Sequence, residues 1–113
     1  MSMHIWAVEP DGHTLRSDHD VVDVIGEALH RGAEWVVIPA ERLGDDFFQL
    51  RTRIAGEIVQ KFVNYRLKLA IVGDISRYMA ASSALRAFVS ESNRGNQLWF
   101  VTSAEELDDR LGR

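Results

Sequence analysis

The sequence predicts an α/β fold in which a mainly parallel sheet of four or five strands packs against helices. Two observations predict this fold. Short apolar runs of strand length alternate with amphipathic segments of helical period along the chain. Strands that alternate with helices imply crossover connections, which join parallel strands. Because 113 residues suffice for one hydrophobic core but not for two, we expect a single domain over residues 1–113.

The N-terminal segment predicts an antiparallel hairpin. Residues 3–8 have the composition of a strand, and the Pro-Asp-Gly sequence at residues 10–12 is typical of a turn. A second short strand is expected at residues 14–15. This hairpin would add an antiparallel edge strand to the otherwise parallel sheet, so that the predicted sheet is mixed.

Helices and strands alternate through the rest of the chain. Ser17 can cap a first helix, because Asp20 follows in the first turn and apolar residues recur at helical spacing until Gly32. Three further helices bring the predicted number to about four. They are expected at residues 46–63, 82–95 and 103–111, and they alternate with strands at residues 35–38, 67–72 and 98–101.

The composition excludes several classes of protein. Cysteine is absent, which excludes disulfides, zinc–thiolate sites and cysteine nucleophiles and fits a reducing compartment. The formal charge is -4 and no basic cluster occurs, so we expect no nucleic-acid partner. The chain shows neither a signal peptide nor an apolar run of membrane-spanning length. We therefore expect a cytoplasmic protein without a membrane partner.

The middle of the chain carries a series of distinctive segments. They are residues 46–48 (Asp-Phe-Phe), 55–62 (Ala-Gly-Glu-Ile-Val-Gln-Lys-Phe), 64–66 (Asn-Tyr-Arg), 69–74 (Leu-Ala-Ile-Val-Gly-Asp) and 91–93 (Glu-Ser-Asn). In this order they resemble the domain-of-unknown-function family 4180, and the resemblance extends over nearly the whole chain. That family consists of small bacterial proteins without an assigned activity. The resemblance therefore implies a bacterial protein but no particular chemistry.

The order of the predicted elements is also similar to that of the STAS domain of anti-sigma-factor antagonists. This likeness of architecture implies regulation through a protein partner. In STAS antagonists a phosphorylatable serine opens the helix after the central strand. The corresponding residues 44–47 are Gly-Asp-Asp-Phe and include no hydroxyl group. A partner that docks there would meet the permanent negative charge of Asp45 and Asp46.

The segment 46–63 is the most informative element for function. On a helical wheel its apolar side chains fill an arc of roughly 220°, which is wider than packing on one sheet face requires. We therefore expect a second packing partner, either another helix of the same chain or a second subunit in a homodimer. The apolar residues of this arc are Phe47, Phe48, Leu50, Ile54, Ala55, Ile58, Val59, Phe62 and Val63.

Arg51 falls inside the apolar arc, where a charge needs a partner. Asp74 directly follows the predicted strand 67–72, so we expect it at the carboxyl ends of the strands. Ligands of open α/β sheets bind along that edge. Two interpretations stay open. Arg51 is structural, either in an ion pair with Asp74 or with its charged end extended to solvent, or it contacts an anionic ligand.

The remaining polar groups give weaker signals. His13, Asp18, His19 and Asp20 gather where the first helix begins, but their spacing favours a solvated cluster over a metal site. The glycine-containing loops at residues 73–76 and 93–96 lack the spacing of phosphate-binding loops. No nucleophile elbow or kinase signature occurs. We therefore expect no metal, no cofactor and no catalytic residue.

Together these features favour a non-catalytic module that acts through an unknown protein partner and forms a homodimer. The alternative is a small-molecule-binding or anion-binding protein, or an enzyme, with its site near Arg51 and Asp74. In an enzyme, Glu57 or Glu91 would be the nearest acid. The residues expected to bind a partner or ligand are Asp45, Asp46, Phe47, Phe48, Arg51, Glu57, Gly73, Asp74 and Ser76.

Overall fold

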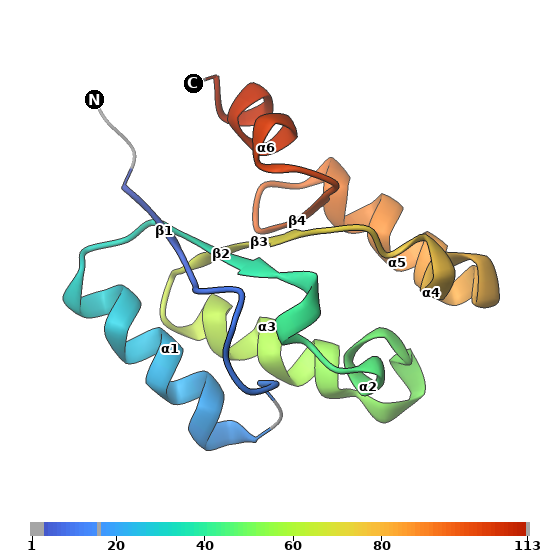
Figure 1. The fold of residues 1–113 in the computed structure, drawn as a ribbon, viewed down its shortest axis with the longest axis horizontal. Coiled ribbons are helices and arrows are strands. Elements are labelled where there is room, and N and C mark those ends of the chain that lie inside the picture. The colour runs from blue at the N-terminus through green and yellow to red at the C-terminus, as the bar shows by residue number, and fades with distance from the viewer. Residues whose placement is uncertain (1–3, 16, 113) are drawn as a thin grey trace.

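A computed structural model describes residues 4–15 and 17–112 of the chain. In this part of the chain, four parallel strands form one sheet in the order β1-β2-β3-β4 (Figure 1). The α/β class and the parallel arrangement predicted from the sequence are confirmed. The strands are β1 (Ile5–Ala7), β2 (Trp35–Pro39), β3 (Lys68–Val72) and β4 (Leu98–Val101).

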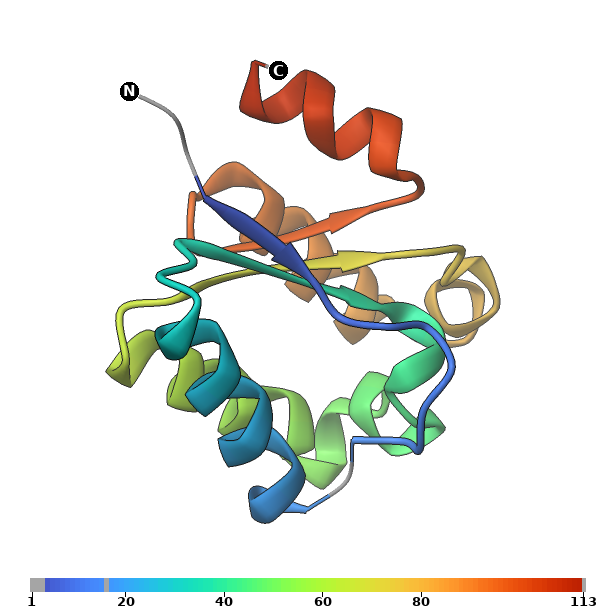
Figure 2. The ribbon, with the colours of Figure 1, turned by 60° about the vertical axis from the view of Figure 1, so that its left-hand side comes forward.

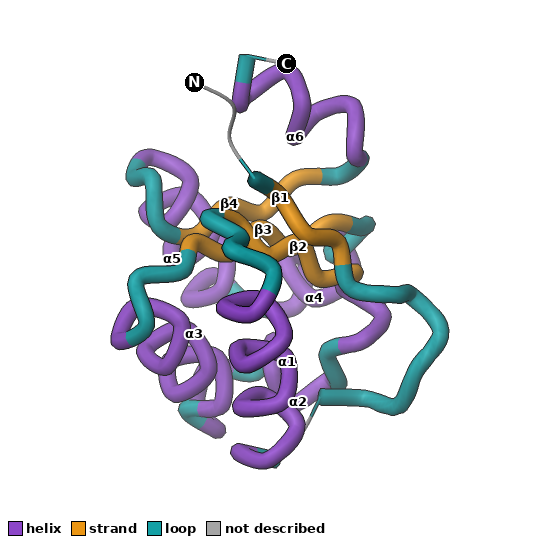
Figure 3. The backbone as a smooth tube through the Cα atoms, turned by 90° about the vertical axis from the view of Figure 1, so that its left-hand side faces the viewer, coloured by secondary structure: helices purple, strands orange, loops and turns teal. Residues whose placement is uncertain are grey.

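The helices cover the two faces of the sheet unequally. Because crossovers between parallel strands are right-handed, the sequential strand order places the crossover helices on one face. Figures 2 and 3 show α1 and α3 on that face and α6 on the opposite side. The α-helices are α1 (Asp18–His30), α2 (Asp45–Phe48), α3 (Ile54–Asn64), α4 (Ser76–Ala81), α5 (Ser83–Arg94) and α6 (Ala104–Leu111); η1 (Ala40–Arg42) and η2 (Leu50–Thr52) are short 3-10 helices.

Side chains of the strands alternate between two cores. Val36, Leu69 and Phe100 belong to the larger core, which α1, α3 and α5 complete. Trp35 and Trp99 belong to the smaller core on the other face, where their ring centroids lie 4.4 Å apart. Both cores bury apolar side chains of β2, β3 and β4, so these three strands are covered on both faces.

The predicted N-terminal hairpin is wrong. β1 pairs with β2 in parallel, and residues 14–15 do not form a strand. The loop after β1 instead wraps around the buried side chain of Arg42, whose Nε donates a hydrogen bond of 2.9 Å to the carbonyl of His13. Arg42 Nη1 also donates to the carbonyl of Glu9. These bonds hold the loop away from β1, so the sheet is all-parallel within the described residues.

The single helix predicted at residues 46–63 is also wrong, because α2, η2 and α3 replace it. Arg53 separates η2 from α3 with a left-handed φ of 66°. The Thr52 hydroxyl lies 2.7 Å from the carbonyl oxygen of Asp46 and accepts a hydrogen bond of 3.3 Å from the Ile54 amide. Bonds between side chain and backbone compete with the helical ladder. The chain therefore turns between α2 and α3.

Most of the apolar arc of this segment is buried by the chain itself. Val63 remains 38% exposed. Intramolecular packing thus accounts for the wide arc, and the homodimer stays a prediction. Phe47, Phe48, Ala55, Ile58 and Phe62 are buried in the larger core, and Leu50, Ile54 and Val59 pack against it.

The predicted start of the first helix is confirmed. Ser17 caps α1, and its side chain and that of Asp20 form the reciprocal hydrogen bonds of a capping box. Helix α4 was not predicted and adds a short turn between β3 and α5. None of the helices in the described part of the chain has the length and apolar character that a bilayer demands.

Candidate functional site

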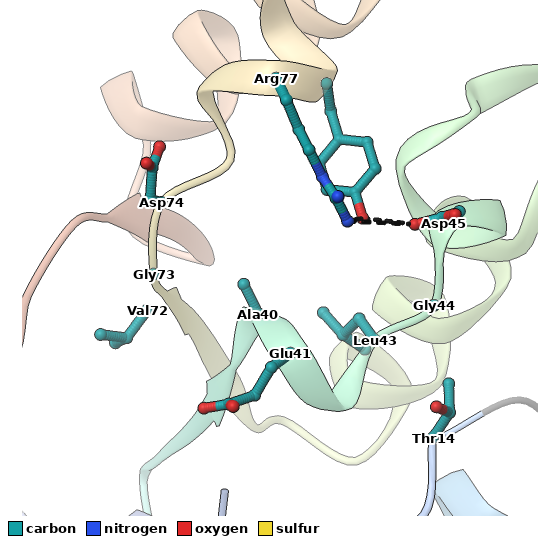
Figure 4. Close-up of a pocket in the computed structure, with 11 residues that line it drawn as sticks. Thr14, Ala40, Glu41, Leu43, Gly44, Asp45, Val72, Gly73, Asp74 and Arg77 are labelled. Carbon is teal, nitrogen blue, oxygen red and sulfur yellow. Dashed lines mark hydrogen bonds and ion pairs between the residues drawn. The ribbon is translucent and has the colours of Figure 1, made fainter.

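A cavity of about 600 Å³ opens at the carboxyl ends of β2 and β3. We call it the rim cavity. In Figure 4, Ala40 and Leu43 point into it from below, and Arg77 reaches toward Asp45 across its top. Its lining residues come from the N-terminal loop, the connection after β2, the end of β3 and α4. They are Thr14, Ala40, Glu41, Leu43, Gly44, Asp45, Val72, Gly73, Asp74, Arg77 and Tyr78.

The rim cavity is formed by two connections that project beyond the sheet. The strand order contains no reversal, so no crevice arises from the sheet topology. Instead, η1 follows β2, and α4 follows β3 after only three residues. Gly73 lets these connections approach closely, because a Cβ added there would lie 2.9 Å from the Cβ of Ala40. Its φ of 147° also favours glycine.

Three side chains join the two connections across the cavity, and we call Asp45, Arg77 and Tyr78 the bridge. The Tyr78 hydroxyl donates a hydrogen bond of 2.5 Å to Asp45 Oδ1 and accepts one of 2.6 Å from Arg77 Nη2. Arg77 Nη2 also lies 3.4 Å from Asp45 Oδ1. The Tyr78 ring stacks on Phe48, with centroids 4.4 Å apart. The bridge therefore ties α4 to α2.

The bridge shifts the proton affinity of its members. Burial raises the pKa of the Tyr78 hydroxyl, and its hydrogen bond to Asp45 raises the pKa further. The hydrogen bond with Tyr78 also raises the pKa of the Arg77 guanidinium. At neutral pH the bridge thus combines a neutral phenol with a guanidinium and a carboxylate.

Asp74 supplies a second carboxylate at the rim. Its Oδ1 accepts a hydrogen bond of 2.9 Å from the Ser76 amide. Hydrogen bonds from the Ser76 side chain and backbone lower the pKa of this exposed carboxyl group. Asp74 is therefore ionised at neutral pH.

A second cavity, of about 660 Å³, lies on the other side of the bridge. We call it the side cavity. It shares Asp45, Arg77 and Tyr78 with the rim cavity but has more apolar walls. Arg51 lines it, and Arg51 Nη2 lies 3.3 Å from Gln49 Oε1. The lining residues are Asp45, Phe48, Gln49, Leu50, Arg51, Arg77, Tyr78, Ala81, Ser82 and Ala84.

A family model described as domain of unknown function (DUF4180) matches residues 1–111. The chain belongs to the DUF4180 family. No curated protein matches the chain. No solved structure matches it either, so the architectural likeness to STAS domains stays a prediction.

Five of the predicted site residues line the two cavities of this DUF4180 chain. Asp45, Gly73 and Asp74 line the rim cavity, whereas Phe48 and Arg51 line the side cavity together with Asp45. The expected ion pair between Arg51 and Asp74 is wrong, because it is not among the ion pairs of residues 4–15 and 17–112. Arg51 is exposed because η2 replaces the continuous helix.

The other predicted site residues lie elsewhere. Ser76 lines a smaller pocket with Gly73 and Asp74, and its amide donates a hydrogen bond to Asp74. Asp46 and Phe47 line a smaller hollow beside Leu15, which shares Gly44 and Asp45 with the rim cavity. Glu57 lies on α3 in a shallow depression with Asp18 and Lys61. The alternative acid Glu91 pairs with Arg94 on α5 at 3.4 Å.

Sequence reasoning missed Thr14, Glu41, Arg77 and Tyr78. Arg77 and Tyr78 were missed because no helix was predicted between the strand 67–72 and the helix 82–95. A usable signal was present, since Asp74 precedes Ser76 by two residues, as in an Asx-turn, and helix-forming residues follow. Thr14 and Glu41 carry no comparable local signal, because only the fold brings them to the rim.

The histidines near α1 form two separate pairs. His13 Nε2 lies 3.0 Å from Asp20 Oδ1, and His19 Nε2 lies 3.5 Å from Asp23 Oδ2. The two imidazoles therefore contact different carboxylates. Within the described residues, no group of three histidine, aspartate or glutamate side chains could hold a metal ion.

Proposed function

We propose that this DUF4180 protein binds a small polar molecule in the rim cavity. The observation that carries this proposal is the bridge beside a cavity of about 600 Å³ at the strand carboxyl ends. The volume falls within the range of roughly 300–1,000 Å³ typical of ligand sites. Ala40 and Leu43 provide an apolar floor, while carboxylates, a guanidinium and hydroxyl groups surround it. Such a mixture suits recognition of a polar ligand.

The charges at the rim argue against a small anion as the ligand. Glu41, Asp45 and Asp74 contribute three carboxylates, whereas Arg77 is the one cationic side chain of the lining described above. The guanidinium is already engaged by Asp45 and the Tyr78 hydroxyl. A phosphate or sulfate group would therefore meet more repulsion than attraction.

A thermal-shift screen of polar metabolites tests this proposal. The panel contains amino acids, short peptides, sugars, nucleosides and organic acids. A ligand at ten times its Kd stabilises the folded state by about 1.4 kcal/mol, which raises the melting temperature by several degrees. Glu41→Trp places an indole at the cavity lining and should remove the shift. Glu41→Gln is the matched variant that leaves the cavity open.

The proposal fails if no compound stabilises the wild-type protein. It also fails if a stabilising compound protects Glu41→Trp as well as it protects the wild type, because that compound then binds elsewhere. Native mass spectrometry of the freshly purified protein adds an independent readout. A co-purified small molecule retained by Glu41→Gln and lost from Glu41→Trp would support the proposal.

Protein contact, including a homodimer, is a second candidate function. One observation favours it, because four large apolar side chains remain exposed on or directly after α1 and α3. These helices lie side by side (Figure 2). Sedimentation velocity at micromolar concentration tests the homodimer, and a purely monomeric profile would contradict it. The exposed residues are Val22 (49%), Leu29 (47%), Val63 (38%) and Tyr65 (52%).

A further inference from the structure

The rim cavity and the side cavity meet at the bridge. Asp45, Arg77 and Tyr78 line both of them. Each cavity alone has the volume of a site for a drug-sized ligand. A ligand longer than one amino acid can therefore occupy both cavities by lying across the bridge.

The two cavities carry opposite charges beyond the bridge. On the rim side, Glu41 and Asp74 add two carboxylates. On the other side, Arg51 adds a guanidinium whose hydrogen-bond partner is the neutral amide of Gln49. Within the bridge, the charges of Asp45 and Arg77 compensate each other across 3.4 Å. The path across the bridge thus runs from a negative end to a positive end.

The wall of the side cavity next to Arg51 is apolar. Phe48 and Leu50 lie in its wall beside Arg51, and Ala81 and Ala84 complete it. An apolar group placed there would be removed from water, which favours binding. The side cavity therefore suits a ligand end that combines an anionic group with an apolar side chain.

We propose that the two cavities form one site for a short zwitterionic peptide with free ends. Its amino group pairs with Asp74, its carboxylate pairs with Arg51, and its C-terminal apolar side chain fills the side cavity. This inference rests on the proposed function and names the ligand class of that site. A lone cation would leave Arg51 unused, and a lone anion would face the rim carboxylates. A molecule with a positive charge at one end and a negative charge at the other can pair with the charged residues on both sides of the bridge.

The tripeptide Gly-Gly-Leu with free termini is the test probe, and isothermal titration calorimetry at low ionic strength measures its Kd. Acetylation of its N-terminus removes the positive charge, and amidation of its C-terminus removes the negative charge. We expect each capped form to bind about two- to fivefold more weakly, since an ion pair between exposed groups contributes about 0.5–1 kcal/mol.

Two variants assign each end of the peptide to its side of the bridge. Asp74→Asn should bind the free and acetylated peptides with similar affinity, because the partner of the amino group is gone. Arg51→Gln should bind the free and amidated peptides with similar affinity. The matched controls are Glu57→Gln and Arg31→Gln, which change exposed residues outside both cavities and should bind Gly-Gly-Leu as the wild type does.

The possible outcomes separate this inference from the proposed function. The inference is overturned if the capped peptides bind as tightly as the free peptide, or if Asp74→Asn and Arg51→Gln keep the wild-type preferences. It is also overturned if Gly-Gly-Leu does not bind while another metabolite stabilises the wild type but not Glu41→Trp. In that case the proposed function stands. If no compound binds, both proposals fail.

Discussion

At the scale of single residues, Tyr78 makes three interactions, of which the hydrogen bond that its hydroxyl donates to Asp45 requires the neutral phenol. Its ring stacks on Phe48 at an interplanar angle of 12°. Its hydroxyl donates to the Asp45 carboxylate and accepts from Arg77. An ionised phenol would lose the donated proton and face the Asp45 carboxylate as a like charge. The bridge therefore depends on a protonated Tyr78.

This dependence predicts a loss of stability at alkaline pH. Because the folded-state pKa of Tyr78 is raised, its contribution is complete below the ordinary tyrosine pKa of about 10 and is lost as pH rises through the folded pKa. We expect the free energy of unfolding to fall more steeply in the wild type than in Tyr78→Phe over this range. Urea unfolding at a series of pH values from about 8 upward measures it.

Tyr65 provides the control for this prediction, since its side chain is 52% exposed and the chain contains two tyrosines. Tyr65→Phe should keep the wild-type pH dependence. A Tyr78→Phe variant that loses stability with pH as steeply as the wild type would show that the bridge does not control this effect.

At the scale of elements, short polar groups decide where the segment after β2 stops being helical. The Thr52 hydroxyl lies within hydrogen-bond distance of the carbonyl oxygens of Asp46 and Gln49. Arg53 then takes a left-handed conformation with φ 66°. This break turns Arg51 outward into the side cavity and lets Phe48 stack on Tyr78. The geometry of the candidate site therefore depends on the break.

The substitution Arg53→Gly tests whether the helix is broken at this residue, because its effect on the free energy of unfolding has opposite signs in a break and in a continuous helix. A left-handed conformation costs an L-residue about 1–2 kcal/mol and costs glycine little, so Arg53→Gly should raise the free energy of unfolding by up to about 1 kcal/mol. In a continuous helix the same change would lower it by about 1 kcal/mol. Urea unfolding distinguishes the two signs.

The comparison for this prediction is Glu57→Gly, which changes an exposed position inside α3. We expect it to lower the free energy of unfolding by about 1 kcal/mol. If Arg53→Gly destabilises the protein as much as Glu57→Gly does, residue 53 is helical in solution and the break is wrong.

At the scale of the whole molecule, the two faces of the sheet have unequal cover. The larger core lies against α1, α3 and α5, whereas α6 covers the smaller core through Leu107. Trp35, Trp99 and Leu107 are all buried there. Arg110 of α6 adds a contact at 4.0 Å over the ring of Trp99. The smaller core therefore depends on one short helix.

Truncation of Leu107 tests how much that helix stabilises the fold. Leu107→Ala removes a side chain that is 4% exposed and should lower the free energy of unfolding by about 2–5 kcal/mol. Leu111→Ala, at the partly buried end of α6, should cost clearly less. Tryptophan fluorescence during urea unfolding measures both, because two tryptophans lie in this core. Equal losses would contradict the central role of Leu107.

Local patterns along the chain were enough to predict those parts of the fold that depend on neighbouring residues. Apolar runs of strand length placed β2, β3 and β4, and helical spacing after a capping serine placed α1, α5 and α6. The sequence also indicated the strand carboxyl ends as a candidate site, where of Arg51, Asp74 and Ser76 only Asp74 lines the rim cavity, together with Asp45 and Gly73 from the other predicted residues. Periodicity and capping act within one or two turns of the chain, so one sequence suffices to read them.

Tertiary structure alone decided the features that join distant residues. Arg42 donates a hydrogen bond to the carbonyl of His13, 29 residues earlier in the sequence, and this bond fixes the loop in a position that excludes the hairpin. Tyr78 reaches Asp45 across 33 positions and divides the edge of the sheet into two cavities. Such contacts form only after the strands align and the cores exclude water. Their energies depend on three-dimensional distance and burial, which a periodic pattern along the chain does not encode.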